Sequence, residues 1–294
     1  MSKVFYKLFV PVLLTLLCPA CITEVDVGAC NNTVISFENL VDGNDEFKDN
    51  IETVTYVIYD SEGKIVYQKT LSADELDDFQ GLKVRLPEAG HYRVVAWGNY
   101  DSSNSQIGPT GKPGENQIVI NGNDPSSFDN LYLGTLDFDL PSVDGRHEWT
   151  LDMKPQVVEI DAVIKSELPD ADQVYEIKVG PLPNGITSGG EIIGDDDTYY
   201  TGSFTVGEDG KIESTVKLPP FDENTDAVIQ IINKETGEVV SEIKLSDYLK
   251  ENGLPGGGDD DNKKPVIDIE ISVSGTDVSI TFPGWKPKPV YPSI

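Results

Sequence analysis

Residues 51–100 constrain the fold of this chain more than any other stretch. Residues 53–59 and 65–71 are rich in β-branched and aromatic side chains, which favour strands. Residues 60–63, which follow the first run, end in Gly63, and glycine takes a positive φ without steric cost, so the chain can reverse direction there. The pattern predicts a β-hairpin.

A short helix and two more strands are expected directly after this hairpin. The Ser72 hydroxyl can accept from a free amide of a new helix, and Glu75 can accept from the Ser72 amide in return. This capping box predicts a helix over residues 72–79. Residues 82–86 alternate apolar and basic side chains, and residues 92–97 form a nearly continuous apolar run. The whole stretch therefore predicts half of a β-sandwich with one helical crossover.

The N-terminus carries the pattern of an export signal. Lys3 and Lys7 precede an apolar run over residues 8–17, which is too short to span a bilayer but suits a secretory signal. The small Ala20 stands before Cys21, as in the recognition box of a bacterial lipoprotein signal peptidase. We therefore expect residues 1–20 to be removed and Cys21 to be the lipidated first residue.

Two alternatives stay open at this cleavage site. Cys18 and Pro19 stand where the lipoprotein box usually has Leu and a small residue, so cleavage after Ala20 without lipidation is one alternative, and Cys18 as the modified cysteine is the other. If Cys21 carries lipid, Cys30 has no partner within the exported chain, which excludes a disulfide framework. Cys30 is then a small buried apolar group or an intermolecular bridge.

The charge of the chain excludes one class of partner. It has 51 Asp and Glu against 22 Lys and Arg, a net charge of −29, and its longest basic cluster is Lys263-Lys264. Phosphate backbones and anionic membrane surfaces repel such a surface, so no nucleic acid is expected as a partner. The same charge also keeps an exported protein dispersed.

The length of 294 residues suits two domains. We expect a tether over residues 21–32, a β-sandwich over residues 33–155, and a second β-sandwich with a Pro-rich tail over residues 156–294. Residues 100–114 are expected to be a long loop. Further strands are predicted at residues 33–38, 117–121, 131–133, 148–153, 157–164, 175–179, 199–206, 211–218, 227–232, 266–273 and 278–282.

A weak internal repeat supports two related domains in tandem. Gly63 and Ser72 have the same separation as Gly237 and Ser246, and in both places a strand, a Gly turn, a second strand and a Leu-Ser junction lead to a short predicted helix. Chance similarity between two hairpins is the alternative.

These features together resemble a known family. The early Cys21, the acidic spacer before Cys30, the hairpin turn DSEGK at residues 60–64 and the run LPEAGHYRVVAWGN at residues 86–99 are similar to the FimB-type anchor lipoproteins of type V fimbriae. The resemblance implies an all-β protein with two tandem transthyretin-like, Greek-key β-sandwiches, held on the outer membrane by lipid at Cys21. It also implies fimbrial stalk subunits as partners.

Enzymatic chemistry finds little support in the sequence. His91 and His147 are isolated from any nucleophile or metal motif, so no catalytic residue, cofactor or metal is expected. The Asp triplets at residues 195–197 and 259–261 could collect Ca²⁺, but neither has EF-hand spacing, and solvated loop charge is the simpler interpretation.

Aromatic residues offer two further hypotheses. Trp97 and Trp149 lie in apolar strand patterns and are expected in the core rather than stacked on sugar rings. Four prolines favour an extended tail after residue 282, in which Trp285, Val290 and Tyr291 are candidate partner-binding residues. The alternative is that this tail wraps over its own domain.

Two functions follow from these observations. The first is a non-enzymatic outer-membrane lipoprotein that anchors or terminates a fimbrial fibre through β-strand complementation with a neighbouring subunit. The second is a surface glycan- or protein-binding adhesin lipoprotein on the same scaffold.

Overall fold

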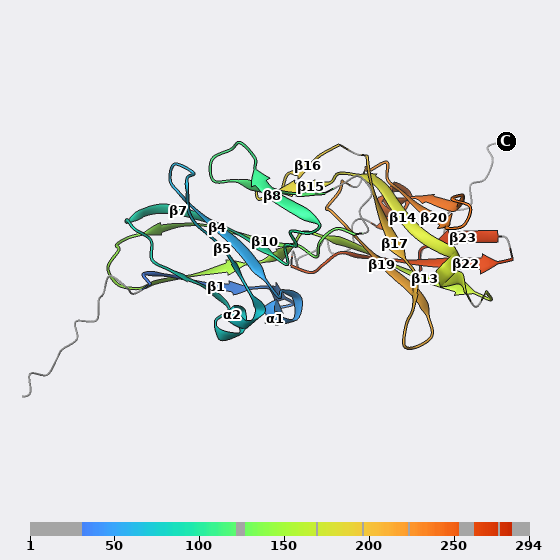
Figure 1. Cartoon of the computed structure of the whole chain (residues 1–294), viewed down its shortest axis with the longest axis horizontal. Coiled ribbons are helices and arrows are strands. Elements are labelled where there is room, and N and C mark those ends of the chain that lie inside the picture. Colours follow the sequence, from blue (N-terminus) through green and yellow to red (C-terminus); the bar gives the residue numbers. More distant parts are fainter. Residues whose placement is uncertain are drawn as a thin grey trace, which may run out of the picture. The chain divides into compact units, whose positions relative to one another are not determined.

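The computed structural model describes residues 31–283 apart from gaps at residues 122–126, 169, 196, 223, 253–261 and 276. Strands dominate the described residues, and the helices among them are short (Figure 1). None of these helices is long and apolar enough to cross a bilayer. The all-β sandwich class predicted from the sequence is confirmed.

The first sandwich consists of two sheets, with strand orders β11-β1-β6 and β12-β10-β7-β4-β5. β1 is parallel to β11 and antiparallel to β6, whereas all pairs in the second sheet are antiparallel. The strands are β1 (Thr33–Glu38), β4 (Val54–Asp60), β5 (Ile65–Leu71), β6 (Gly81–Val84), β7 (Gly90–Gly98), β10 (Tyr132–Leu140), β11 (His147–Asp152) and β12 (Lys154–Pro155).

The two faces of β4 are both covered, which explains why nearly every side chain of this strand is apolar. Tyr56 and Ile58 pack with Ile35 of β1 in the core between the two sheets. Val57 and Tyr59 point to the opposite face and belong to a second apolar cluster. A strand buried on both faces loses the alternation of apolar and polar residues.

A third sheet, of order β16-β15-β9-β8, covers that opposite face. Its strands come from two distant parts of the chain, and the central pair sets Ile118 against Ile186. The strands are β8 (Ser105–Pro109), β9 (Asn116–Ile120), β15 (Gly185–Thr187) and β16 (Ile192–Ile193). The prediction of a loop over residues 100–114 is therefore wrong, because β8 forms by pairing with β9 although its Ser, Gly and Pro residues have low β propensity.

The second sandwich has the sheet orders β18-β19-β13-β22-β23 and β17-β14-β20-β21. β13 and β22 are parallel, as β1 and β11 are in the first sandwich. The strands are β13 (Val158–Ser166), β14 (Tyr175–Leu182), β17 (Thr198–Ser203), β18 (Thr205–Val206), β19 (Ile212–Leu218), β20 (Val228–Asn233), β21 (Val239–Lys244), β22 (Val266–Ser274) and β23 (Asp277–Thr281). Apolar side chains from both sheets fill one cluster, among them Ile160, Val216, Ile269, Ile177 and Ile229.

The hairpin and helix predicted at residues 51–79 are confirmed. Gly63 has a φ of +77° in the β4–β5 turn, and Ser72 and Glu75 form both halves of the capping box at the start of α2. The second copy of this unit is β20, β21 and α4. The helices are α1 (Phe47–Asn50), α2 (Ala73–Asp78), α3 (Ala171–Val174) and α4 (Leu245–Asn252), and a two-residue pair, β2 (Leu40–Val41) and β3 (Asn44–Asp45), precedes α1.

Candidate functional site

β5 is an exposed edge strand. It pairs with β4 on one side, and no strand in the described part of the chain pairs with its other side. Ile65 is 51% exposed and Tyr67 is 39% exposed. An unpaired edge presents a row of backbone amides and carbonyls to solvent, so β5 is open to the addition of another strand.

The register of the hairpin turns two β5 side chains toward the third sheet. Val57 lies opposite Gln68 and Tyr59 lies opposite Ile65, with a shift of register between Ile58 and Tyr59. Because residues opposite each other share a face of a sheet, Ile65 and Gln68 lie on the same face as Val57 and Tyr59.

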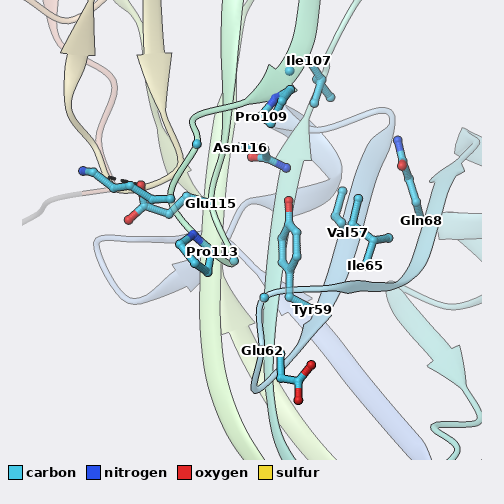
Figure 2. A pocket seen from close by; sticks show the side chains of 15 residues that line it. Val57, Tyr59, Glu62, Ile65, Gln68, Ile107, Pro109, Pro113, Glu115 and Asn116 are labelled. Atoms are coloured by element: carbon cyan, nitrogen blue, oxygen red, sulfur yellow. Dashed lines mark ion pairs between the residues drawn. The ribbon is translucent and has the colours of Figure 1, made fainter.

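A groove of about 520 Å³ runs along this face beside β5 (Figure 2). β4 and β5 supply one wall, and β8 with the β8–β9 loop supplies the other. The apolar lining side chains are Val57, Tyr59, Ile65, Ile107, Pro109 and Pro113. The groove therefore offers an apolar slot directly beside an unpaired strand edge.

The β4–β5 turn closes one end of the groove by packing against the β8–β9 loop. A Cβ atom added at Gly63 would lie 2.5 Å from Cβ of Pro113, closer than two carbon atoms can approach. Only glycine therefore allows this contact, and its positive φ is also the conformation that the turn requires.

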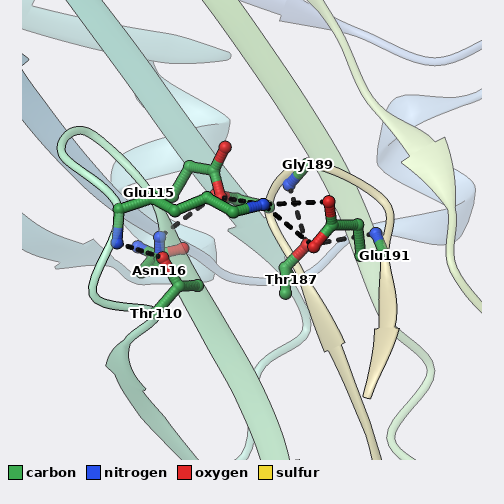
Figure 3. A network of polar contacts seen from close by, with 8 residues as sticks. Thr110, Glu115, Asn116, Thr187, Gly189 and Glu191 are labelled. Carbon is green, nitrogen blue, oxygen red and sulfur yellow. Dashed lines mark hydrogen bonds and ion pairs between the residues drawn. The ribbon is translucent and has the colours of Figure 1, made fainter.

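Polar contacts hold the β8–β9 loop against the turn that follows β15 (Figure 3). Nζ of Lys112 lies 2.9 Å from Oε1 of Glu191 and 3.7 Å from Oε2 of Glu115. The Asn116 amide donates to Oγ of Ser188 at 3.1 Å, and the Ser188 amide donates to the Asn116 carbonyl at 2.7 Å. The wall of the groove formed by β8 and the β8–β9 loop is thus held by hydrogen bonds of the main chain as well as by ion pairs.

The charged residues that line the groove, Glu62, Lys112 and Glu115, lie in the β4–β5 turn and the β8–β9 loop, whereas the Tyr59 and Asn116 side chains are neutral. Burial raises the pKa of Tyr59 above its usual value, and the Asn116 side chain and the Arg93 charge only partly offset this effect. The Tyr59 ring points along the groove toward Asn116 (Figure 2), whose Oδ1 accepts from Nε1 of the buried Trp97 at 2.9 Å. The groove floor is suited to an apolar side chain rather than to an ion.

The residues predicted to bind partners or lipid lie outside the described part of the chain. These are Cys21, at the start of the expected tether, and Trp285, Val290 and Tyr291 in the tail. Their roles stay predictions.

The structure tests the other candidate residues. Trp97 is fully buried, and Trp149 is partly buried against Phe138, so the prediction that both belong to the core is confirmed. Both histidines lie in the first sandwich, where His91 is exposed and His147 is partly buried. Nδ1 of His91 lies 3.1 Å from Oδ1 of Asp139.

The candidate calcium ligands are the Asp triplets at residues 195–197 and 259–261. No group of three or more His, Cys, Asp or Glu side chains within the described residues is placed to hold a metal ion. Asp196 and residues 259–261 lie outside these residues.

Sequence reasoning missed the groove. Ile65 and Tyr67 are apolar strand residues in the sequence, but nothing local to β5 indicates that no described strand pairs with its second edge. The opposite wall comes from β8, which the sequence placed in a loop.

Comparison with known families identifies the class of protein. A family model for the fimbrillin-A associated anchor proteins Mfa1 and Mfa2 matches residues 27–289. The chain belongs to this family of fimbrial anchors. The family is structural, associates with fimbrial subunits and acts at the cell envelope. The resemblance to fimbrial anchors is confirmed at this level, and the narrower FimB type stays a prediction.

Solved structures share the fold. The fimbrial anchor protein Mfa2 from Porphyromonas gingivalis has a TM-score of 0.61 and 16% identity, over 86% of this chain and 97% of that chain. A candidate polysaccharide-binding protein from Bacteroides thetaiotaomicron has a TM-score of 0.66 and 14% identity, over 87% and 96%. A candidate adhesin from the same organism has a TM-score of 0.64 and 15% identity, over 86% and 96%. A comparison with curated protein sequences found no match.

Proposed function

We propose that the protein is an outer-membrane lipoprotein that anchors or terminates a fimbrial fibre, and that a neighbouring subunit joins it by adding a strand to β5. The observation that carries this proposal is the unpaired edge of β5 beside the apolar groove.

A strand added at this edge would gain two kinds of contact. Its backbone would pair with the free amides and carbonyls of β5, and each such hydrogen bond contributes about 0.5–1.5 kcal/mol. Side chains on one face of the added strand would enter the slot between Ile65 and Pro109. Backbone pairing supplies affinity, and the slot selects which side chain the partner presents.

The N-terminal sequence supports attachment of the protein to the membrane. Lipid on Cys21 would hold the base, residues 21–32 would act as a tether, and residues 33–155 and 156–294 would form the two sandwich domains. Twelve tether residues reach about 40 Å when extended, enough to clear the lipid head groups.

The proposed joint, in which a partner strand is added to β5, is tested by placing the same charge on two equivalent strands. Ile65→Lys puts an ammonium at the mouth of the groove, and lysine on an edge strand opposes the addition of another strand. Val239→Lys is the matched control, because Val239 is 49% exposed on β21, the corresponding strand of the second sandwich. In a pull-down with purified fimbrial stalk subunits, we expect Ile65→Lys to weaken binding at least about tenfold, or about 1.4 kcal/mol, and Val239→Lys to leave it unchanged.

Equal effects of the two substitutions, or none, would refute the β5 joint. Lipid anchoring is tested separately, by intact mass and membrane fractionation of the exported protein beside Cys21→Ala. Acyl mass on the wild type and release of the variant are expected. An unmodified wild-type N-terminus would refute the anchor and leave a soluble fibre subunit or a tip adhesin.

A polar pocket of about 490 Å³ favours glycan binding as a second candidate function. It lies beside Tyr100 and is lined by carboxylate and amide side chains that include Asp49, Glu52, Asp101 and Asn130. Such side chains hydrogen-bond sugar hydroxyls while an aromatic ring covers a sugar face. Binding to a glycan array that is lost in Tyr100→Ala would support this function, and an array without signal would exclude it for the glycans tested.

A further inference from the structure

A second large groove lies on the sheet β18-β19-β13-β22-β23 of the second sandwich, away from β5. It has a volume of about 690 Å³ and crosses β13, β19 and β22. Its apolar lining includes Val163, Ile212 and Pro283. Pro283 is the last residue that the structure describes, so the chain leaves the described part of the protein at this groove.

Carboxylates outnumber ammonium groups in the groove. The acids are Asp161, Glu213, Asp268 and Glu270, and the lysines are Lys165 and Lys211. Nζ of Lys165 lies 2.5 Å from Oε2 of Glu270, and Lys211 is paired with Asp209, which is not a lining residue. The groove therefore presents an excess of negative charge around an apolar floor.

The sequence that follows Pro283 has the complementary chemistry. Residues 284–294 contain two lysines, Lys286 and Lys288, and no acid. Trp285, Val290 and Tyr291 are apolar, and three prolines in this segment favour an extended backbone. At about 3.1 Å per residue, seven residues after Pro283 cover about 22 Å, which is within the length of a nine-residue strand such as β13.

We propose that residues 284–294 bind in this groove of their own chain. Trp285 and Val290 cover the apolar floor, and Lys286 and Lys288 lie against the carboxylates of β13 and β22. Because the segment is joined to the groove at Pro283, its effective concentration there is far above that of any segment from a separate molecule. This inference does not rest on the anchor function and concerns a surface distant in sequence from β5.

A photoreactive label tests the position of the segment in the full-length chain. Trp285 is replaced by benzoyl-phenylalanine, the protein is irradiated when dilute, and cross-linked peptides are mapped by mass spectrometry. Cross-links within one chain to residues of β13, β19 or β22 are expected. Cross-links to another molecule, to a different surface of the same chain or to solvent alone would overturn the proposal, and capture of a fimbrial subunit would assign the segment to a partner instead.

Charge reversal tests the electrostatic part of the same contact. Lys286→Glu together with Lys288→Glu should lower the yield of the cross-link to the groove severalfold, and Asp268→Lys added to this pair should restore part of the yield. Lys263→Glu, at an exposed lysine away from the groove lining, is the matched control and should have no effect. A yield that does not change with these reversals or with salt would refute the pairing of lysines with carboxylates.

Discussion

The two hairpin–helix units of this protein have similar local structure but different surroundings. β4, β5 and α2 form one unit, and β20, β21 and α4 form the other, each with a shift of register near the turn. Both β5 and β21 are the last strands of their sheets, and no described strand pairs with the outer side of either. The two edges differ in that β23 of the facing sheet lies beside β21.

The helices of the two units are also held in different ways. At the start of α2 the capping box provides acceptors for the backbone amides of Ser72 and Glu75, and Leu76 is the buried side chain of this helix. In α4 both Leu245 and Leu249 are buried, and the Leu245 amide donates to the Ala227 carbonyl at 3.0 Å. Local hydrogen bonds define the first helix, and packing defines the second.

Among substitutions that compare the two helices, the largest loss of stability is expected in α4. Leu249→Ala removes a buried side chain and should lower the free energy of unfolding by about 2–5 kcal/mol, because the apolar contacts are lost and a cavity remains. Asp247→Ala, on the exposed side of the same helix, is the matched control and should change stability by less than about 0.5 kcal/mol. Urea unfolding measures both, and similar losses in the two variants would contradict a helix held by packing.

A smaller effect is expected at the start of α2. Ser72→Ala removes the hydroxyl that accepts from the Glu75 amide, which should cost about 1 kcal/mol. Ser61→Ala, in the exposed β4–β5 turn, serves as the control for loss of a serine hydroxyl. Thermal unfolding that gives equal midpoints for Ser72→Ala and the wild type would show that α2 does not need its cap.

The smallest effect is a dependence of stability on pH at the same cap. The Lys69 ammonium, at 2.5 Å, and the Ser72 amide hold the pKa of Glu75 below its usual value of 4.5. Since the pKa is lowered in the folded state, the stabilising contribution is present above pH 4.5 and is lost as the pH falls through the lowered value.

The matched variant for this effect is Glu75→Gln. In this variant the free energy of unfolding should fall less steeply below pH 4.5, because the Glu75 carboxylate no longer titrates. Asp78→Asn, at the other end of α2, should keep the steeper fall of the wild type. Chemical unfolding across this pH range measures the difference. An identical acid profile for Glu75→Gln and the wild type would exclude a role for the ion pair.

Features set by a few neighbouring residues were predictable from the sequence. The β4–β5 hairpin follows from two β-rich runs and Gly63, and α2 follows from Ser72 and Glu75, because each depends on contacts within about four residues. The all-β class and most strands follow from periodicity for the same reason. The candidate site was not predictable, because the residues on its two walls are distant in sequence.

The sequence by itself determined the hairpins, the helix cap and the fimbrial-anchor resemblance, all of which are written in contiguous residues. Only the tertiary structure decided that β1 pairs in parallel with β11, that β8 is a strand, and that Ile118 meets Ile186 across the third sheet. It also decided that the second edge of β5 is paired with no strand among the described residues. The physical reason is that a strand sequence specifies its own extended backbone and its two faces, whereas its neighbour depends on which distant segment gains most by pairing there.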